Sequence, residues 1–173
     1  MTRAGVCIVL RGPLGVGKTT VARALAKELR ARVISIDDIL EREGLEQWED
    51  GYISEAAFVR ANTFAANEAA PTLRKGAPVI VDGNFYHRGA IEDLLARLGT
   101  PHLVVTLVAP LATCVQRDRA REGSFGAAAT RDVFRKVAEV RYGIEVDARP
   151  PVEQIVGKIL EQVRSNADPR SVE

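Results

Sequence analysis

The chain has 173 residues, the length of a single globular domain, and its apolar (46%) and charged (27%) fractions are those of a protein that folds around its own core. The net charge of +1 gives no global basic field that would point to nucleic acid, so an RNA-binding role would need a local basic patch. The first apolar run, residues 6–10, is broken by Arg11 and is too short for a signal peptide or a membrane span.

Short apolar runs bounded by turn residues alternate with longer segments of helical period. The runs predict strands over residues 6–10, 32–36, 78–82, 102–108 and 144–147, and the longer segments predict helices over residues 17–30, 54–75, 88–98, 111–121, 130–141 and 152–164. Strands that are apolar on both faces and separated by helices form parallel sheets covered on both sides. We therefore expect one α/β domain over residues 1–173, a three-layer sandwich with a five-stranded parallel sheet, helices on both faces and a loose tail at 165–173.

The two cysteines, Cys7 and Cys114, lie in apolar surroundings and lack the spacing of a C-x-x-C or histidine-containing metal site. They predict buried thiols in a reducing compartment, and hence a cytoplasmic protein, rather than a disulfide or a zinc site.

The first predicted strand is followed by the pattern G-x-x-x-x-G-K-T, and a helical segment comes directly after it. This is the context of a P-loop, in which glycines let backbone N–H groups surround phosphate oxygens and the helix N-terminus faces the same anion. Lys18 is expected to reach the β- and γ-phosphates and the Thr19 hydroxyl to ligate Mg²⁺. The predicted nucleotide-binding residues are Gly12, Pro13, Leu14, Gly15, Val16, Gly17, Lys18, Thr19 and Thr20.

Two aspartates, Asp37 and Asp38, follow the second predicted strand. They can open the next helix, because aspartate is favoured at N-caps and in first turns. A carboxylate at this strand end can also accept the proton of an attacking hydroxyl in phosphoryl transfer. We predict Asp37 as the catalytic base, because it directly follows the strand, and Asp38 as an acceptor-binding residue.

The third predicted strand ends at Asp82, which fits the acidic residue that orients Mg²⁺, although an N-cap or turn aspartate would look the same. The loop after it carries Asn84, Tyr86 and His87, whose polar tips are suited to contacting an acceptor. Aromatic side chains at such a position serve equally well as packing.

The segment after the fourth predicted strand is rich in arginine, with Arg117, Arg119 and Arg121 before the small, flexible residues 124–130. Arg117 and Arg121 are four apart, so on one helix face they repel each other unless an anion lies between them. A charge run is often only a solvated face. Beside a triphosphate, however, we interpret residues 117–136 as a lid whose arginines stabilise the transferring group. Arg117 or Arg119, together with the loop of residues 147–150 that contains Arg149, is expected to flank the base.

The segment over about 41–75, between the second and third strands, predicts a mainly helical insertion that forms the acceptor wall. Arg60 in this segment either holds an acceptor phosphate or is an ordinary surface arginine. The chain has no Asn-Lys-x-Asp motif, which a GTPase would use to read its base.

The chain resembles the adenylate kinase-like group of P-loop kinases. Its segments Asp82-Gly-Asn-Phe-Tyr86 and Pro110-Leu-Ala-Thr-Cys114-Val-Gln-Arg117-Asp-x-x-Arg121 look most like the kinase domain of O-phosphoseryl-tRNA kinase, and the second is also similar to adenylylsulfate kinase. Polynucleotide kinase shares the same core. The resemblance implies that Asp37 is the catalytic carboxylate and that Arg117 and Arg121 lie near the phosphates.

Taken together, the sequence predicts an ATP- and Mg²⁺-dependent kinase that transfers the γ-phosphoryl group to an alcohol of a small molecule, a nucleoside or RNA. Lys18 and the arginine pair would neutralise developing charge, and Thr19 with Asp82 would hold the metal. Two alternatives stay open: an NTP-hydrolysing switch that binds a protein or RNA partner, and an adenylylsulfate kinase. The sequence names neither the acceptor nor the oligomeric state.

Overall fold

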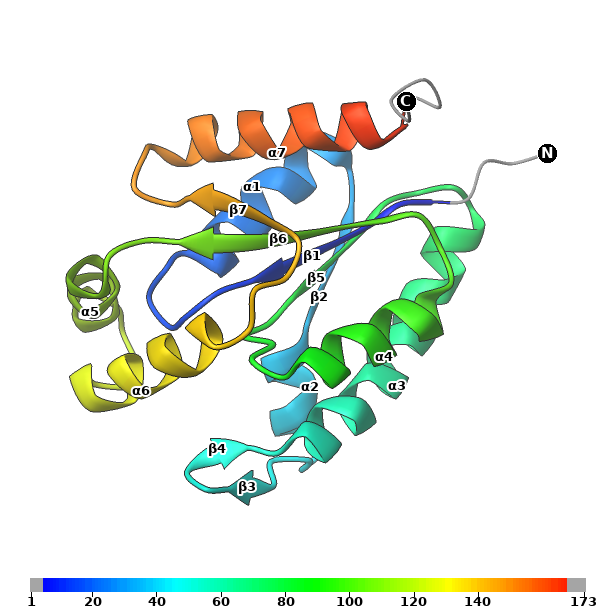
Figure 1. Cartoon of the computed structure of the whole chain (residues 1–173). Coiled ribbons are helices and arrows are strands. Elements are labelled where there is room, and N and C mark those ends of the chain that lie inside the picture. Colours follow the sequence, from blue (N-terminus) through cyan, green and yellow to red (C-terminus); the bar gives the residue numbers. More distant parts are fainter. Residues whose placement is uncertain (1–4, 168–173) are drawn as a thin grey trace.

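Five parallel strands form the central sheet of the computed structural model, which describes residues 5–167 (Figure 1). They are β1 (Cys7–Arg11), β2 (Arg32–Ser35), β5 (Val79–Asp82), β6 (His102–Val108) and β7 (Ile144–Asp147). Their order in the sheet is β2-β5-β1-β6-β7, so β1 lies in the centre and pairs with β5 and β6. The predicted α/β fold class with a five-stranded parallel sheet is confirmed.

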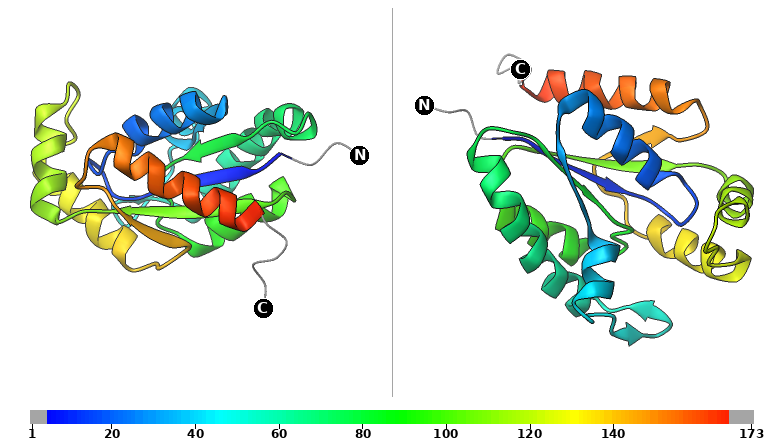
Figure 2. Two further views of the ribbon diagram at one scale, coloured as in Figure 1. Left: turned by 90° about the horizontal axis from the view of Figure 1, so that it is seen from above. Right: turned by 180° about the vertical axis from the view of Figure 1, so that it is seen from behind.

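Helices cover both faces of this sheet (Figures 1 and 2). One face is covered by α1 (Lys18–Leu29) and α7 (Val152–Ala167), and the other by α3 (Glu55–Arg74), α4 (Arg88–Leu98) and α6 (Ala127–Ala138). The short helix α2 (Ile36–Arg42) lies beside α3, and α5 (Leu111–Ala120) lies beyond the carboxyl ends of the strands. A small hairpin of β3 (Trp48–Glu49) and β4 (Tyr52–Ile53) projects from the α2–α3 connection.

The alternation of side chains along the strands explains why the sheet has two cores. In β1, Cys7 and Val9 pack into the cluster under α3 and α4, whereas Ile8 and Leu10 pack into the cluster under α1 and α7. All of these side chains are completely buried. Because both faces are covered, the strands read as continuous apolar runs rather than as an alternating pattern.

The predicted strands are all present, each within one residue of its expected limits. Helix α4 has the predicted bounds, while α6 begins at Ala127 instead of residue 130. The expected tail at 165–173 is helical as far as Ala167, because α7 continues to that residue, and the rest of it lies outside the described residues. Two features were not predicted: the hairpin within the 41–75 insertion, and α2, which begins at Ile36 where a strand was expected.

No helix within residues 5–167 is long and apolar enough to cross a membrane.

Gly143 makes the turn between α6 and β7 at a point of close backbone approach. Its φ of 68° lies in the left-handed region, and a Cβ at this position would lie 2.1 Å from the carbonyl oxygen of Val104 in β6. Only glycine fits both constraints. The return of the chain into the edge strand β7 therefore depends on this residue.

We expect Gly143→Ala to lower the free energy of unfolding by about 1–3 kcal/mol, because the new methyl group adds backbone strain and a clash with β6. The matched control is Gly157→Ala in α7, where a Cβ meets no atom within 4 Å. That change should raise stability by about 0.5–1 kcal/mol, since alanine is the better helix former. Urea unfolding of both variants measures the two changes in the free energy of unfolding. Equal stability of Gly143→Ala and the parent would contradict the close approach of Gly143 to Val104.

Candidate active site

The register of the sheet brings three strand ends together at one edge. Leu10 of β1 and Ser35 of β2 both pair with Asp82 of β5. The residues that follow these positions are therefore neighbours in space although they are far apart in sequence. This edge is where α/β sheets bind their ligands.

The loop after β1 has the backbone of an anion-binding P-loop. Gly15 and Gly17 have φ values of 73° and 105°, and a Cβ at Gly15 would lie 2.1 Å from the carbonyl oxygen of Cys114 in α5. Helix α1 begins at Lys18 without a side-chain cap, so its first backbone N–H groups face the loop. These donors and the positive end of the helix suit a phosphate group.

Lys18 lies at the centre of the site. Its side chain is buried, and Nζ donates hydrogen bonds of 2.9 Å to the carbonyl oxygens of both Gly12 and Pro13. Desolvation lowers the pKa of Lys18, while the carboxylates of Asp82 and Asp37 act in the opposite direction. The ammonium group is thus already held at the phosphate loop by neutral acceptors, with two acids close to it.

Asp82 and Thr19 form the oxygen-rich side of the loop. The Thr19 hydroxyl lies 3.5 Å from Oδ2 of Asp82, whose side chain is only 6% exposed. Burial raises the pKa of Asp82 to about 6, although Lys18 works against this shift. Hard oxygen donors of this kind suit Mg²⁺. Within residues 5–167 no group of three or more His, Cys, Asp or Glu could hold a metal.

Asp37 and Asp38 lie in the first turn of α2 rather than directly after β2. The strand ends at Ser35, and the Ser35 hydroxyl caps the helix by accepting a 3.2 Å hydrogen bond from the backbone N–H of Asp38. Neither aspartate therefore serves as the N-cap. Asp37 is exposed, but the protein atoms around its carboxyl desolvate it and raise its pKa, and Lys18 opposes this shift.

The polar side chains of the loop after Asp82 have two different surroundings. The Tyr86 hydroxyl accepts a 2.8 Å hydrogen bond from the Ile53 amide, and Nε2 of His87 lies 2.9 Å from the Ile53 carbonyl oxygen. These two residues fix the β3–β4 hairpin to the loop, and Tyr86 also packs edge-on against Phe58. Asn84 is different, because its side chain is 9% exposed and its buried Oδ1 has no hydrogen-bond partner.

The arginines of the predicted lid do not form one cluster. Nη1 of Arg117 donates to the carbonyl oxygens of Val16 (3.0 Å) and Ala148 (2.8 Å), so it joins the P-loop to the segment after β7. Arg121 ends α5, and its guanidinium lies over the Phe125 ring at 4.9 Å. Its charge acts on both Lys18 and Asp37, which places it beside the site.

The other predicted arginines lie apart from this centre. Arg119 is two residues along α5 from Arg117, on the opposite helix face, where it lines a surface groove with Arg131. Arg149 forms an ion pair of 2.8 Å with Asp147. Arg60 is exposed on α3.

Two residues of this region were missed by the sequence reasoning, Arg11 and Asp118, and both side chains are fully buried. Asp118 accepts hydrogen bonds from the Ser124 hydroxyl (2.7 Å) and from the backbone N–H groups of Phe125 (3.3 Å) and Gly126 (3.0 Å). It therefore shapes the turn that leads from α5 to α6. The available signal in the sequence was a charged residue, Asp118, on an apolar helix face. This pattern does not reveal which groups form hydrogen bonds with the aspartate.

Comparison with known proteins identifies a family and structural relatives of this chain. Residues 7–144 match the family model described as an AAA domain (AAA_33). A shikimate kinase from Pseudomonas aeruginosa (strain UCBPP-PA14) is 28% identical over 182 residues, covering 92% of this chain and 96% of the relative. A sugar kinase from Janibacter sp. HTCC2649 has a TM-score of 0.75 at 21% identity, covering 93% of this chain and 95% of that one. A gluconokinase from Sinorhizobium meliloti 1021 has a TM-score of 0.71 at 18% identity, covering 96% and 99%. At these identities the two structures establish the shared fold.

The raised pKa of Asp82 predicts that the nucleotide-free, metal-free protein loses stability as the pH rises. In the unfolded chain this carboxyl ionises near its ordinary value of 3.8, whereas in the folded protein it ionises near 6. Between these values the folded state binds more protons, so the free energy of unfolding should fall by about 2–3 kcal/mol and then level off above pH 6.

Asp82→Asn should remove this loss, since the amide resembles the protonated acid. The variant should equal the parent near pH 4 and exceed it in stability at pH 7, as measured by urea unfolding in the presence of a chelator. Curves that run parallel at all pH values would show that Asp82 does not have a raised pKa.

Proposed function

Because the chain belongs to the AAA domain family AAA_33, whose model spans residues 7–144, we propose that it is an ATP-dependent kinase that transfers the γ-phosphoryl group to a hydroxyl of a small molecule. The observation that carries the proposal is the convergence of Lys18, Asp82 and Asp37 at the mouth of the P-loop. The predicted resemblance to P-loop kinases agrees with the matched shikimate kinase and gluconokinase.

ATP binds along residues 12–20, with its phosphates against the loop amides and the N-terminus of α1. Lys18 exchanges its bonds to Gly12 and Pro13 for the β- and γ-phosphate oxygens. The base lies near residues 147–150, which Arg117 connects to the P-loop through the Ala148 carbonyl. Arg149 can turn from Asp147 toward the nucleotide. Arg119 lies on the outer groove, so we favour Arg149 as the arginine that contacts the base.

Thr19 and Asp82 would hold Mg²⁺, since the hydroxyl and carboxylate oxygens lie on the phosphate side of the loop. The ion, when bound, neutralises negative charge on the β- and γ-phosphates. Its positive charge would also favour the ionised form of Asp82, whose burial otherwise raises its pKa.

Asp37 acts as the general base. It accepts the proton of the acceptor hydroxyl while that oxygen attacks the γ-phosphorus and the bond to the β-phosphate oxygen breaks, releasing ADP. Ser35 carries out the capping of α2, so the Asp37 carboxylate is free for this task. Its raised pKa makes it a better proton acceptor than an ordinary aspartate. Arg121 neutralises charge that develops on the transferring group.

The acceptor binds between the loop after Asp82 and the 41–75 insertion. Asn84 supplies an unused hydrogen-bond acceptor, and Asp38 supplies a second oxygen at the start of α2. Tyr86 and His87 contribute by holding the hairpin in place. Arg60 would contact only an acceptor large enough to reach the exposed face of α3.

Small hydroxylated acceptors are favoured by the names of the matched proteins, which act on shikimate, gluconate or sugars. RNA as an acceptor stays an open proposal. We also infer a cytoplasmic location from the two buried free thiols, Cys7 and Cys114.

A phosphate-transfer screen tests the function. The protein is incubated with ATP, Mg²⁺ and a panel of sugars, sugar acids, cyclitols and nucleosides, with Lys18→Ala as the inactive control. We expect one class to accelerate ATP consumption and to become phosphorylated. Stimulation of ATP hydrolysis by macromolecules alone, with no phosphorylated acceptor, would favour the NTP-hydrolysing switch.

Asp37→Asn provides the sharpest test of the mechanism. The amide keeps the size of the side chain but cannot accept the proton, so phosphoryl transfer should fall by about two to four orders of magnitude. ATP affinity, measured by calorimetry, should change little.

Asp38→Asn is the matched control and should be milder, because Asp38 lies one position further along the same helical turn. A critical Asp38 with a dispensable Asp37 would reverse the assignment of the base. If neither change slowed transfer, the acceptor hydroxyl would be activated without a carboxylate.

A further inference from the structure

Arg11, the last residue of β1, is a fully buried cation that forms no ion pair among the described residues. Its guanidinium uses four of its five N–H groups in hydrogen bonds to neutral oxygens. Desolvation lowers its pKa to about 10, which leaves it charged at neutral pH. A buried charge of this kind is costly unless its surroundings compensate it, so the groups around Arg11 must offset this cost.

The acceptors of Arg11 come from three separate segments. Nε donates to the carbonyl oxygen of Phe85 (3.1 Å), in the loop of residues 83–87, and Nη1 donates to the Thr106 hydroxyl of β6 (2.9 Å). Nη1 and Nη2 donate to the carbonyl oxygens of Val140 (2.8 Å) and Val137 (3.1 Å), at the C-terminal end of α6. The negative end of the α6 dipole and the carboxylate of Glu145, which lines the same cavity, therefore supply compensating charge.

The bond to Phe85 stabilises a strained backbone. Phe85 has a φ of 43°, which is rare for a bulky residue and persists only where the surroundings enforce it. Its neighbours in the loop are Asn84, with the unpaired Oδ1, and Tyr86, which anchors the hairpin. The direction of the Phe85 carbonyl thus fixes how the acceptor loop presents these side chains.

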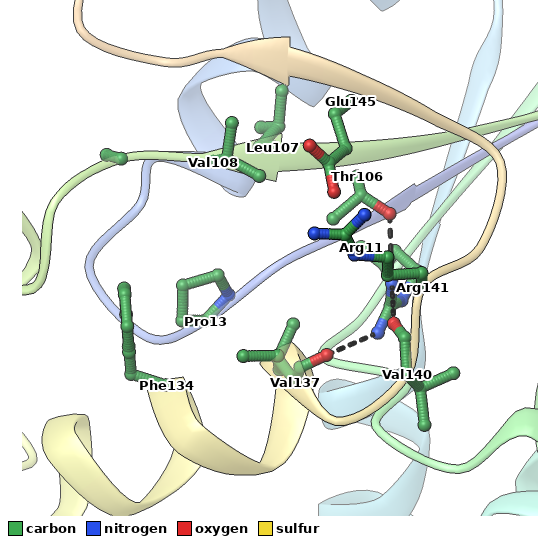
Figure 3. A pocket seen from close by; sticks show the side chains of 12 residues that line it. Arg11, Pro13, Thr106, Leu107, Val108, Phe134, Val137, Val140, Arg141 and Glu145 are labelled. Carbon is green, nitrogen blue, oxygen red and sulfur yellow. Dashed lines mark hydrogen bonds between the residues drawn. The ribbon is translucent and has the colours of Figure 1, made fainter.

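Packing alone does not fix α6. A cavity of about 170 Å³ lies between this helix and the β6–β7 side of the sheet, lined by Arg11, Pro13, Phe134, Val137 and Ala138 among others (Figure 3). Figure 3 shows the dashed hydrogen bonds from the guanidinium to Val137 and Val140 at the edge of this space. Val137 packs into the core, and these hydrogen bonds add to that packing in holding the C-terminal end of α6 at the sheet.

We propose that Arg11 is a positioning residue that couples the acceptor loop at residues 83–87 to the C-terminal end of α6, at the rear of the lid. The proposal rests on the kinase function above. One rigid guanidinium, placed immediately before Gly12, sets the P-loop, the acceptor loop and the lid helix relative to one another. Lysine cannot replace it, because a single nitrogen does not reach acceptors that lie in several directions.

The test compares Arg11→Lys and Arg11→Met with the control variant Arg97→Lys. Arg97 lies on α4 and forms a hydrogen bond with Asp93 of the same helix. Backbone hydrogen exchange is read in three places: the last turn of α6, residues 83–87, and α1. We expect at least tenfold faster exchange in the first two and no change in α1. The control should match the parent throughout.

Kinetics provide the second readout. In folded Arg11→Lys, kcat should fall by at least about tenfold and the acceptor KM should rise, while ATP affinity stays within about threefold. This split separates positioning of the acceptor side from damage to the nucleotide site. If the Arg11 variants fail to fold, Thr106→Val removes one acceptor of the guanidinium and should give a smaller effect in the same direction, with Thr106→Ser close to the parent.

Three results would overturn the coupling: unchanged exchange and kcat in folded Arg11→Lys, a loss of ATP affinity equal to the loss of kcat/KM, or faster exchange spread evenly to α1. The last would make Arg11 a residue of general stability only. A parent protein that phosphorylates no acceptor would instead overturn the proposed function, and the exchange experiment would still decide the coupling.

Discussion

The parallel pairing of β1 with β5 on one side and β6 on the other is the constraint on which the site depends. Hydrogen bonds in a parallel sheet fix where each strand ends relative to its neighbours. The pairing of Leu10 with Asp82 therefore sets the distance between the P-loop and the Asp82 carboxylate, and the pairing of Arg11 with Thr106 sets the guanidinium between the loop of residues 83–87 and α6. A change of register by one residue would exchange the two faces of β1 and place Arg11 in the wrong layer.

The charge balance of the site is incomplete in the protein alone. Asp82 and Asp37 both have raised pKa values because they are desolvated, and Lys18 has a lowered pKa for the same reason. Their mutual attraction offsets only part of this cost. In the proposed mechanism, a nucleotide with a divalent cation would add negative charge beside Lys18 and positive charge beside Asp82, so binding would relieve both costs. Such an arrangement would be an instance of electrostatic preorganisation.

Local patterns were sufficient to predict the sheet, most helices and the P-loop, because strand periodicity and the glycine spacing are each contained within a short segment of the chain. The start of α2 was missed because Ile36 continues the apolar run of β2, and only the Ser35 cap reveals that the helix has begun. The partners of Arg11 could not be predicted for a different reason. They lie 74 to 129 positions away in the sequence, and all four are uncharged groups, three backbone carbonyls and one hydroxyl. The role of Asp118 could not be predicted for a similar reason, since the groups that donate hydrogen bonds to it lie in the turn at Ser124–Gly126.

The arginine run at residues 117–121 shows how a helix terminus separates residues that the sequence presents as equivalent. A regular helix would place Arg117 and Arg121 on one face, where they would repel. Helix α5 ends at Ala120, however, and Arg121 has an extended φ and ψ of −88° and 149°. Arg117 therefore stays with the helix and bonds two backbone carbonyls, while Arg121 departs from it and stacks over Phe125. The buried Asp118 holds the following turn and so maintains this separation. One arginine thus joins two backbone segments beside the P-loop, whereas the other is exposed and lies over an aromatic ring.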